Sequence, residues 1–379
     1  MAKMKILHTI SGLGVSGGGP SQSVFYTVKG LRQQGIDAFV LTYQSAENDS
    51  FVSAEPFIIG LSRPTSQFGY SSQFRSYLEN FKANLYHAQA IWQYPTYITA
   101  KIARKKNKPY IITPRGMLYP QALKKSALKK KVMLALSLRK DLNQAAAVHA
   151  TCMEEMQHLR SLGVKSPIAV IPNPVNIEIG KSETNRTNDK LRVGYLGRVH
   201  PRKNIERLIY AWEKLGEKVN NCELVIVGAG DETYHQFLKD EVKRLSLDNV
   251  IFTGFLSGTE KEDAINSLSY LAVPSDFENF GMIVPEALIQ GIPVIASKGT
   301  PWEELESHNC GWWVDNDTDT LTAAIETALK TPEETRQQMG ENGRRLVMEN
   351  YSVEVVARKM KRLYEWILNG GEKPEFVHT

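Results

Sequence analysis

The stretch IAVIPNPVNIEIGKSETNRTNDKLRVGYLGR, residues 168–198, decides how this chain of 379 residues is divided. It begins with a short apolar run, continues through Pro172-Asn-Pro174 and a polar segment at 178–190, and ends with a second apolar run at 191–196. Short apolar runs bounded by turn residues are typical of buried strands, whereas polar, proline-containing segments are typical of linkers. We therefore expect two domains joined near residue 175, which suits a chain of this length.

Apolar runs of strand length alternate with longer helical patterns on both sides of this linker. The first half has them at 5–10, 38–42, 84–87, 109–113, 146–150 and 168–171, and the second half at 191–196, 223–227, 250–253, 270–273, 293–296 and 311–314. Nearly continuous apolar strands separated by helices indicate parallel sheets covered on both faces. The sequence predicts an α/β fold with two Rossmann-like, doubly wound domains, 1–175 and 176–352, which face each other across a ligand-binding cleft.

The segment 353–368 has apolar residues at helical spacing and is followed by Gly370-Gly371, which predicts a long final helix. This helix either covers the second domain or returns to the first.

The composition is that of an ordinary globular protein, with 42% hydrophobic and 23% charged residues. No apolar run approaches the ~20 residues of a membrane-spanning helix, and the apolar stretch at 6–10 is too short for a secretory signal. Three widely spaced cysteines, Cys152, Cys222 and Cys310, argue against a disulfide framework or a cysteine-based zinc site. A cytoplasmic location is therefore expected.

Charge is distributed unevenly. Residues 1–180 contain 22 Lys and Arg against 9 Asp and Glu, a net +13, and residues 181–379 contain 24 against 32, a net −8. The basic residues of 124–140 are interleaved with apolar ones in the manner of a helix that lies on anionic lipid; they are Lys124, Lys125, Lys129, Lys130, Lys131, Arg139 and Lys140. Alternatively, the apolar side of this helix faces its own domain. Nucleic acid is not expected as a partner, because no recognised binding module accompanies the charge.

A glycine-rich loop, Gly12-Leu-Gly14-Val-Ser-Gly17-Gly18-Gly19, follows the first predicted strand and precedes a helix. Its first six residues read G-x-G-x-x-G, a pattern seen in dinucleotide-binding domains. That interpretation requires an acidic residue at the end of the second strand, but Asp37 lies at its start. We favour a loop whose backbone amides contact an anion or a sugar at a helix N-terminus.

Two cations follow the strand at 191–196. Arg198 comes directly after Gly197, and Lys203 lies five residues further on. A planar guanidinium and a compact ammonium at a strand end suit a diphosphate. The alternative is that both are surface cations at a helix start, where cations are mildly unfavourable.

The most specific motif is PSDFENFGMIVPEALIQG, residues 274–291. It follows a predicted buried strand and leads into a helix whose first turn contains Pro285 and Glu286. Backbone amides near residues 279–282 are then available for phosphate oxygens, and the carboxylates of Glu278 and Glu286 for hydroxyl groups. A glutamate at a helix start is also a common stabiliser.

These residues carry a resemblance. The pattern Glu278-x7-Glu286, with Phe280-Gly281 inside it, resembles the retaining nucleotide-sugar glycosyltransferases of family four. Comparable family motifs match the glycine loop, Ile171-Pro172-Asn173, Gly197-Arg198-x4-Lys203, Gly228-Ala-Gly230 and Gly291-x-Pro293. The resemblance spans residues 5 to about 360. It implies the two-domain glycosyltransferase-B fold, in which the final helix, 353–368, crosses back and packs on the first domain.

The resemblance also implies roles. Arg198 and Lys203 would bind the donor's pyrophosphate and stabilise the leaving group, and Glu278 would contact the sugar hydroxyls; we expect these three to be catalytic. The donor-binding residues would be Glu286 at the ribose, the amides of Phe280, Gly281 and Met282 at the phosphates, Phe255 and Leu256 at the base, and Gly17 and Gly18 over the phosphates. Gly19 and Arg115 would lie on the acceptor side.

One residue departs from the family pattern. Many members have a histidine after the strand that corresponds to 109–113, and this chain has Arg115 there. Arginine cannot act as a base at neutral pH. The substitution fits a mechanism in which the departing phosphate accepts the acceptor's proton on the same face.

We expect a metal-independent retaining glycosyltransferase without a cofactor, which uses a UDP- or GDP-linked sugar and acts in polysaccharide or glycolipid assembly. Its partners would be a glycan or lipid-linked acceptor and an anionic surface at the inner face of the membrane. Two alternatives remain: a sugar-nucleotide epimerase of the same architecture, and a catalytically silent nucleotide-binding partner in a membrane-surface assembly.

Overall fold

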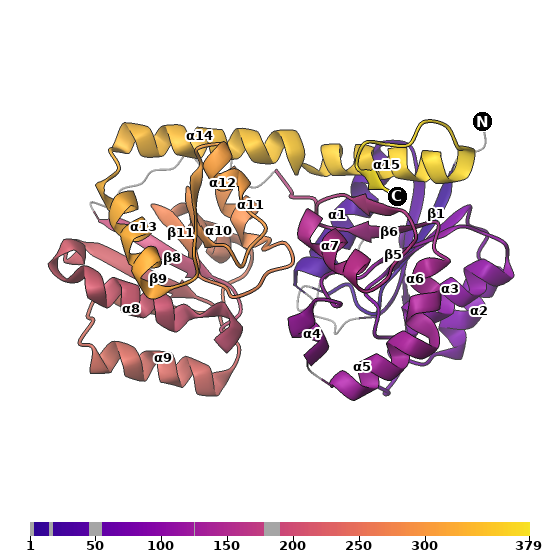
Figure 1. Ribbon diagram of the computed structural model, residues 1–379, viewed down its shortest axis with the longest axis horizontal. Coiled ribbons are helices and arrows are strands. Elements are labelled where there is room, and N and C mark those ends of the chain that lie inside the picture. The colour runs from indigo at the N-terminus through magenta and orange to yellow at the C-terminus, as the bar shows by residue number, and fades with distance from the viewer. Residues whose placement is uncertain (1–3, 15–17, 45–54, 125, 178–189) are drawn as a thin grey trace. The chain divides into compact units, whose positions relative to one another are not determined.

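Figure 1 shows the computed structural model, in which residues 4–14, 18–44, 55–124, 126–177 and 190–379 are described. The chain divides into two units. Unit 1 consists of Met1–Pro174 together with Val353–Thr379, and unit 2 of Val175–Ser352. The greater part of the expected linker, residues 178–189, and Gly17 lie outside the described residues.

Unit 1 contains an eight-stranded sheet with the order β14-β7-β6-β5-β4-β1-β2-β3. Its strands are β1 (Lys5–Thr9), β2 (Asp37–Tyr43), β3 (Ile58–Leu61), β4 (Leu85–Gln89), β5 (Tyr110–Thr113), β6 (Ala147–Ala150), β7 (Ile168–Val170) and β14 (Val377–His378). All pairs are parallel except that of β14 with β7. The strand order reverses between β1 and β4, so the loops after these strands emerge beside one another.

Helices cover both faces of this sheet. Alternate residues of β1 point to opposite faces, with Leu7 in one core and Ile6 in the other. The helical elements are α1 (Gly19–Gln33), α2 (Ser72–Asn80), α3 (Tyr94–Lys105), α4 (Pro120–Lys124), α5 (Ala127–Met133), the π-helical η3 (Leu134–Leu138), α6 (Arg139–Asn143), α7 (Met153–Ser161) and α15 (Val353–Asn369).

The final helix, α15, packs against α1 within unit 1 (Figure 1). Gly30 of α1 permits this close approach, because a Cβ there would lie 2.7 Å from Val353 Cγ1. Val356, Met360 and Tyr364 of α15 are fully buried in the same core as α1.

Unit 2 contains a parallel six-stranded sheet with the order β10-β9-β8-β11-β12-β13. The strands are β8 (Leu191–Leu196), β9 (Cys222–Val227), β10 (Val250–Gly254), β11 (Tyr270–Val273), β12 (Val294–Ser297) and β13 (Gly311–Val314). Its helices are the 3-10 turns η4 (Pro201–Lys203) and η5 (Gly216–Val219), with α8 (Ile205–Leu215), α9 (Glu232–Arg244), α10 (Gly258–Asn266), α11 (Ile283–Ile289), α12 (Glu304–Ser307), α13 (Thr318–Lys330) and α14 (Glu333–Asn350). This is the doubly wound strand order, which reverses between β8 and β11.

The predicted fold class is confirmed: both units are α/β with parallel sheets covered by helices. Every predicted strand run coincides with a strand, and two further strands were not predicted. Strand β3 reads Ile-Ile-Gly-Leu, a four-residue run interrupted by glycine; it lies at a sheet edge, and all four of its residues are half-exposed. Strand β14 has only two residues and gives no periodic signal.

Candidate functional site

The reversal of strand order in unit 2 places two loops side by side. Strands β8 and β11 are paired, with Val193 opposite Tyr270, so residues 197–203 and 274–282 both leave the carboxyl edge of the sheet. Two hydrogen bonds join the loops: the Asp276 amide donates to the Arg202 carbonyl at 3.1 Å, and Asn204 Nδ2 donates to the Pro274 carbonyl at 3.2 Å. The predicted cations Arg198 and Lys203 and the carboxylate of Glu278 therefore belong to one loop pair.

Lys203 and Glu278, predicted separately as phosphate and sugar ligands, form an ion pair across these loops. Ser275 Oγ donates a hydrogen bond of 2.9 Å to the same oxygen of Glu278. The lysine and glutamate side chains remain 24% and 17% exposed. Both charged groups thus keep contact with solvent while their positions are fixed.

Arg198 lies on the same loop as Lys203, five residues before it, and is exposed. Its guanidinium forms no hydrogen bond or ion pair with any described residue, although its carbonyl accepts a 2.9 Å bond from Tyr195 Oη. The backbone around Arg198 is held by the segment 228–230. A Cβ on Gly228 would lie 1.8 Å from the Gly197 carbonyl oxygen, and one on Gly230 would lie 2.1 Å from that of Val199. These glycines allow two loop backbones to touch, and the Arg198 side chain starts beside them, because a Cβ on Gly230 would lie 3.1 Å from Arg198 Cγ.

The loop 276–282 is fixed by neighbouring backbone and by one indole. The Glu278 amide donates to the Gly299 carbonyl at 2.8 Å, and Trp302 Nε1 donates to the Phe280 carbonyl at 2.5 Å. The Phe280 ring is buried against Trp302 and Tyr351, with centroids 5.4 and 5.8 Å away.

This arrangement leaves three backbone donors available. Gly281 has φ +72, a left-handed conformation that favours glycine. The amides of Phe280, Gly281 and Met282 donate to no described residue. Consecutive free amides before a helix form a place where anionic oxygens bind.

Glu286 lies in the first turn of α11, where the sequence places it, and is only 5% exposed. Its Oε2 is 2.6 Å from Lys261 Nζ of α10, a partner that the sequence analysis missed. The sequence does contain a feature that could have indicated this partner: Lys261 lies in the first turn of the helix that follows the predicted base-binding segment. The ion pair gives the buried carboxylate of Glu286 a positively charged partner.

Phe255 and Leu256 follow β10 directly. The Phe255 ring is 68% exposed, whereas Leu256 packs against the core that contains Phe280. Gly254 turns the chain with φ +78, and its carbonyl accepts a 2.8 Å bond from the Gly228 amide. An exposed aromatic ring beside the glycine segment is available for stacking.

In unit 1, Gly18 is the N-cap of α1 with φ +64, and Gly19 is the first residue of the helix. Arg115 follows β5 and lies in the left-handed region with φ +55. It belongs to a different unit from Arg198 and Glu278.

A buried polar network that the sequence analysis did not predict crosses the sheet of unit 1. His8 Nε2 and His87 Nδ1 lie 3.0 and 2.8 Å from Tyr364 Oη, and His87 Nε2 lies 2.7 Å from Thr113 Oγ1. Thr113 Oγ1 is 3.0 Å from His149 Nδ1. The network connects β1, β4, β5 and β6 with α15, and so joins the end of the chain to the sheet.

Burial keeps these histidines neutral. It lowers the pKa of His8 to about 3 and that of His149 to about 4, and it lowers the pKa of His87 well below its usual value. The positive charge of Arg115 acts in the same direction on the pKa of all three. None of them is charged at neutral pH, so each serves as a hydrogen-bonding group.

Two family comparisons cover most of the chain. Residues 176–346 match the family described as Glycosyl transferases group 1, and residues 18–174 match the Glycosyl transferase 4-like domain. The chain belongs to the group 1 glycosyltransferases. The predicted family is thereby confirmed.

Several curated glycosyltransferases are similar to this one. An uncharacterized glycosyltransferase of Methanocaldococcus jannaschii is 28% identical over 51% of this chain and 52% of its own length. The phosphatidyl-myo-inositol mannosyltransferase of Mycobacterium leprae is 29% identical over 54% of each protein. The matched part of this glycosyltransferase thus spans about half the length of these relatives.

Solved structures share the glycosyltransferase-B architecture. Sucrose-phosphate synthase from Thermosynechococcus elongatus is 20% identical, with a TM-score of 0.79 over 97% of this chain and 100% of that chain. Anabaena HepE, solved in complex with UDP and glucose, is 19% identical, with a TM-score of 0.76 over 96% of this chain and 99% of that one. At these identities, the similarity establishes the fold.

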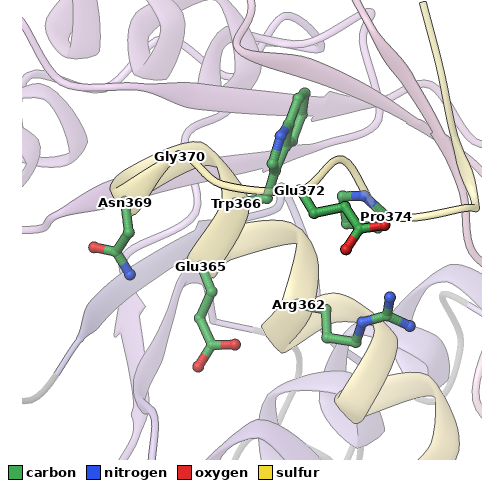
Figure 2. A pocket seen from close by; sticks show the side chains of 7 residues that line it. All are labelled: Arg362, Glu365, Trp366, Asn369, Gly370, Glu372 and Pro374. Atoms are coloured by element: carbon green, nitrogen blue, oxygen red, sulfur yellow. The ribbon is translucent and has the colours of Figure 1, made fainter.

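The glycosyltransferase also has an open pocket at the end of α15, shown in Figure 2. Its volume is about 360 Å³, and none of the predicted site residues lines it. Arg362 lines this pocket, and its guanidinium already donates two hydrogen bonds of 2.9 and 2.7 Å to Glu375. This pocket therefore offers no free cation for an anionic donor.

Within the described part of the glycosyltransferase, no three His, Cys, Asp or Glu residues cluster as metal ligands. Over the same residues, no helix combines the length and apolar character needed to cross a bilayer.

Proposed function

We propose that this protein is a retaining glycosyltransferase that moves a sugar from a UDP- or GDP-linked donor to an acceptor hydroxyl in polysaccharide or glycolipid assembly. The observation that carries the proposal is the loop pair of unit 2. It combines the unbonded guanidinium of Arg198, the Lys203–Glu278 ion pair and three free amides at one edge of the sheet.

In this proposal, the donor's diphosphate binds to Arg198, Lys203 and the amides of 280–282. Glu286 accepts hydrogen bonds from the ribose hydroxyls, and Phe255 stacks on the base. Glu278 accepts hydrogen bonds from hydroxyls of the transferred sugar. The complexes of HepE with UDP and with UDP and glucose support a nucleotide-sugar donor for the same architecture.

The chemistry assigned to these groups is electrostatic. The bond between the sugar's anomeric carbon and the diphosphate oxygen breaks with its electron pair on the oxygen. The acceptor oxygen forms its bond to the anomeric carbon on the same face, and its proton passes to the departing phosphate. Arg198, Lys203 and the loop amides stabilise the negative charge that develops on the leaving group, and we propose that no metal ion is needed for this role.

We also propose that Gly18, Gly19 and Arg115 of unit 1 lie on the acceptor side, and that the acceptor is a glycan or is linked to a lipid. The relative from Mycobacterium leprae, a phosphatidyl-myo-inositol mannosyltransferase, supports a lipid-linked acceptor.

A surface of unit 1 supports contact with anionic lipid from the cytoplasmic side. Leu128, Val132 and Leu136 on α5 and η3 are 78%, 47% and 79% exposed and lie four residues apart, on one side of the helix. Four exposed basic side chains adjoin them: Lys129, Lys131, Arg139 and Lys140. An apolar stripe bordered by basic residues suits the interface of an anionic membrane.

The transfer proposal is tested with radiolabelled UDP- and GDP-sugars and a glycan acceptor mixture. Label in the glycan, with NMR showing that the anomeric configuration of the donor is kept, would support it. Inversion would overturn the retaining mechanism. Binding of a nucleoside diphosphate without any turnover would favour the silent-partner alternative.

The membrane proposal is tested by co-sedimentation with phosphatidylglycerol-containing vesicles. Binding that falls at high salt and in Leu128→Ser/Leu136→Ser supports it. The matched control is Phe237→Ser, which removes an exposed ring of unit 2, 41% exposed and away from this stripe in the chain. Equal binding by all three proteins would contradict the assignment.

A further inference from the structure

Arg115 is held in an unusual backbone conformation after β5. It has φ +55, and the next residue, Gly116, has φ +72. A non-glycine residue in the left-handed region is disfavoured, and such residues concentrate at functional sites. The side chain is nine-tenths buried, with 9% of the residue exposed. The local structure therefore holds a cation inside unit 1 at the carboxyl edge of its sheet.

The hydrogen-bond partners of this guanidinium are neutral. Arg115 Nε donates to Gln89 Oε1 at 3.0 Å, and Nη1 donates to Asn173 Oδ1 at 3.2 Å. Asn173 Oδ1 also accepts a 2.7 Å bond from Ser23 Oγ of α1. Arg115 Nη2 and Asn173 Nδ2 donate to no described residue. Arg115 and Asn173, which are joined by the Nη1–Oδ1 hydrogen bond, thus each keep one donor without an acceptor in the described part of the chain.

Glu155, the carboxylate that interacts electrostatically with Arg115, is hydrogen-bonded to other groups. Glu155 accepts bonds from the Gly116 amide at 2.5 Å and from the Thr151 amide and hydroxyl at 2.8 and 3.0 Å. No described carboxylate oxygen lies within 4.0 Å of the Arg115 nitrogens, so the guanidinium has no direct counter-ion.

Burial of a charge without a direct counter-ion is unfavourable. Desolvation lowers the pKa of Arg115 to about 10, and the more distant Glu155 only partly opposes this shift. The three buried histidines nearby are neutral, so they supply no negative charge. A bound anion would offset the free-energy cost of burying this charge, because arginine binds phosphate and carboxylate groups through paired N–H donors.

We propose that Arg115 Nη2 and Asn173 Nδ2 form an oxyanion subsite in unit 1, which binds a phosphate group of a substrate. The assignment of this phosphate to the acceptor rests on the proposed function. The existence of the subsite does not depend on it. The phosphate belongs either to the acceptor or to the donor's diphosphate, and the experiment below distinguishes them.

The experiment measures the thermal unfolding midpoint with inorganic phosphate at constant ionic strength. All proteins carry Arg198→Ala, which removes the unpaired guanidinium of the proposed donor site in unit 2. In that background we expect phosphate to raise the midpoint, and we expect this rise to disappear in Arg115→Gln. The matched control is Ser23→Ala, which removes the other bond to Asn173 Oδ1 and leaves the guanidinium in place; the rise should persist there.

A second variant keeps the test decisive if Arg115→Gln does not fold. Asn173→Asp preserves the acceptor oxygen for Ser23 and Arg115 and supplies an internal counter-ion of the same size. It should raise the midpoint without phosphate and abolish the phosphate-induced rise. No phosphate effect in the Arg198→Ala background, or an equal effect in Asn173→Asp, would overturn the proposal.

The source of the phosphate is determined with Arg198 intact. If the UDP-induced rise is the same in wild type and Asn173→Asp, while the rise with glycerol 3-phosphate is lost, the acceptor supplies the phosphate. If Asn173→Asp loses the UDP effect, the donor supplies it. Failure of the proposed function has a separate signature: UDP has no effect on wild type, whatever inorganic phosphate does.

Discussion

Lys261 Nζ lies 2.6 Å from Glu286 Oε2, so the ammonium of α10 neutralises the buried carboxylate of α11. The glutamate side chain is 7% exposed and the lysine 37%. The glutamate is enclosed and the lysine is partly open to solvent. A ligand hydroxyl that approaches Glu286 therefore meets a carboxylate whose charge is already balanced by Lys261. The pair connects the helix after the proposed base-binding loop with the helix after the proposed phosphate loop.

The first prediction concerns this pair. Glu286→Gln should weaken UDP binding about 10–100-fold, because hydrogen bonds to a charged acceptor contribute about 1.5–3 kcal/mol. Isothermal titration checks this value. Lys261→Met should lower the free energy of unfolding by about 1–3 kcal/mol, since it leaves a buried carboxylate without a partner. An unchanged UDP affinity in Glu286→Gln would remove Glu286 from the donor site.

The second prediction separates Arg198 from its neighbour Arg202, which is equally exposed on the same loop. Arg198→Ala should reduce kcat about 100–1,000-fold, as loss of one group that stabilises developing charge does. Arg202→Ala should change kcat less than about threefold, because we assign it no ligand. Equal losses in both variants would indicate a general effect of positive charge rather than a placed guanidinium.

The third prediction concerns the contact between loop backbones in unit 2. Gly228→Ala should destabilise unit 2 by about 3 kcal/mol in calorimetry, because its Cβ would lie 1.8 Å from the Gly197 carbonyl oxygen and φ is +145. The control is Gly216→Ala, which has φ +54 and no atom within 4 Å of its Cβ. Only the backbone cost of about 1–2 kcal/mol is expected there. Similar losses in the two variants would show that the close contact is unimportant.

The fourth prediction is a pH dependence of stability from the buried histidines. The pKa of His149 is about 4 in the folded protein and 6.5 in the unfolded chain, so the unfolded chain binds the proton first as pH falls. Stability is therefore complete above pH 6.5 and decreases as the pH falls from there toward 4, by up to about 1.4 kcal/mol per pH unit for this residue.

Urea unfolding of wild type and His149→Gln at several pH values measures this pH-dependent loss of stability. The variant should lose less stability between pH 6.5 and 4 than wild type. His308→Gln, which changes an exposed histidine of unit 2, should retain the wild-type slope. The same slope in all three proteins would contradict the assignment.

The sequence predicted the strands well because parallel strands buried on both faces are continuously apolar. It also placed Arg198 and Glu278 at strand ends, where the loops of a doubly wound sheet gather. It did not predict that Lys203 pairs with Glu278, because these residues are 75 positions apart and their meeting depends on strand order. Lys261 was missed for a related reason: its position in the first turn of α10 is visible in the sequence, but its contact with Glu286, 25 residues further on, depends on how the two helices pack.

The histidine network was hidden for a different reason. His8, His87 and His149 lie in separate predicted strands, where a polar residue amid apolar ones does not indicate what it contacts. His8 and His87 share a partner in Tyr364, which comes from the last helix of the chain. Only the return of α15 to unit 1 brings the tyrosine to them.

The return of α15 to unit 1 also affects the order in which the two units fold during synthesis. Unit 2 is a continuous segment of the chain, whereas unit 1 draws its last helix and β14 from residues made after unit 2 is complete. Until α15 leaves the ribosome, the face of α1 that contains Gly30 has no helix against it, and the hydroxyl that His8 and His87 share is missing. Unit 2 can therefore fold first, although it comes second in the chain, and the N-terminal half reaches its final core only at the end of translation.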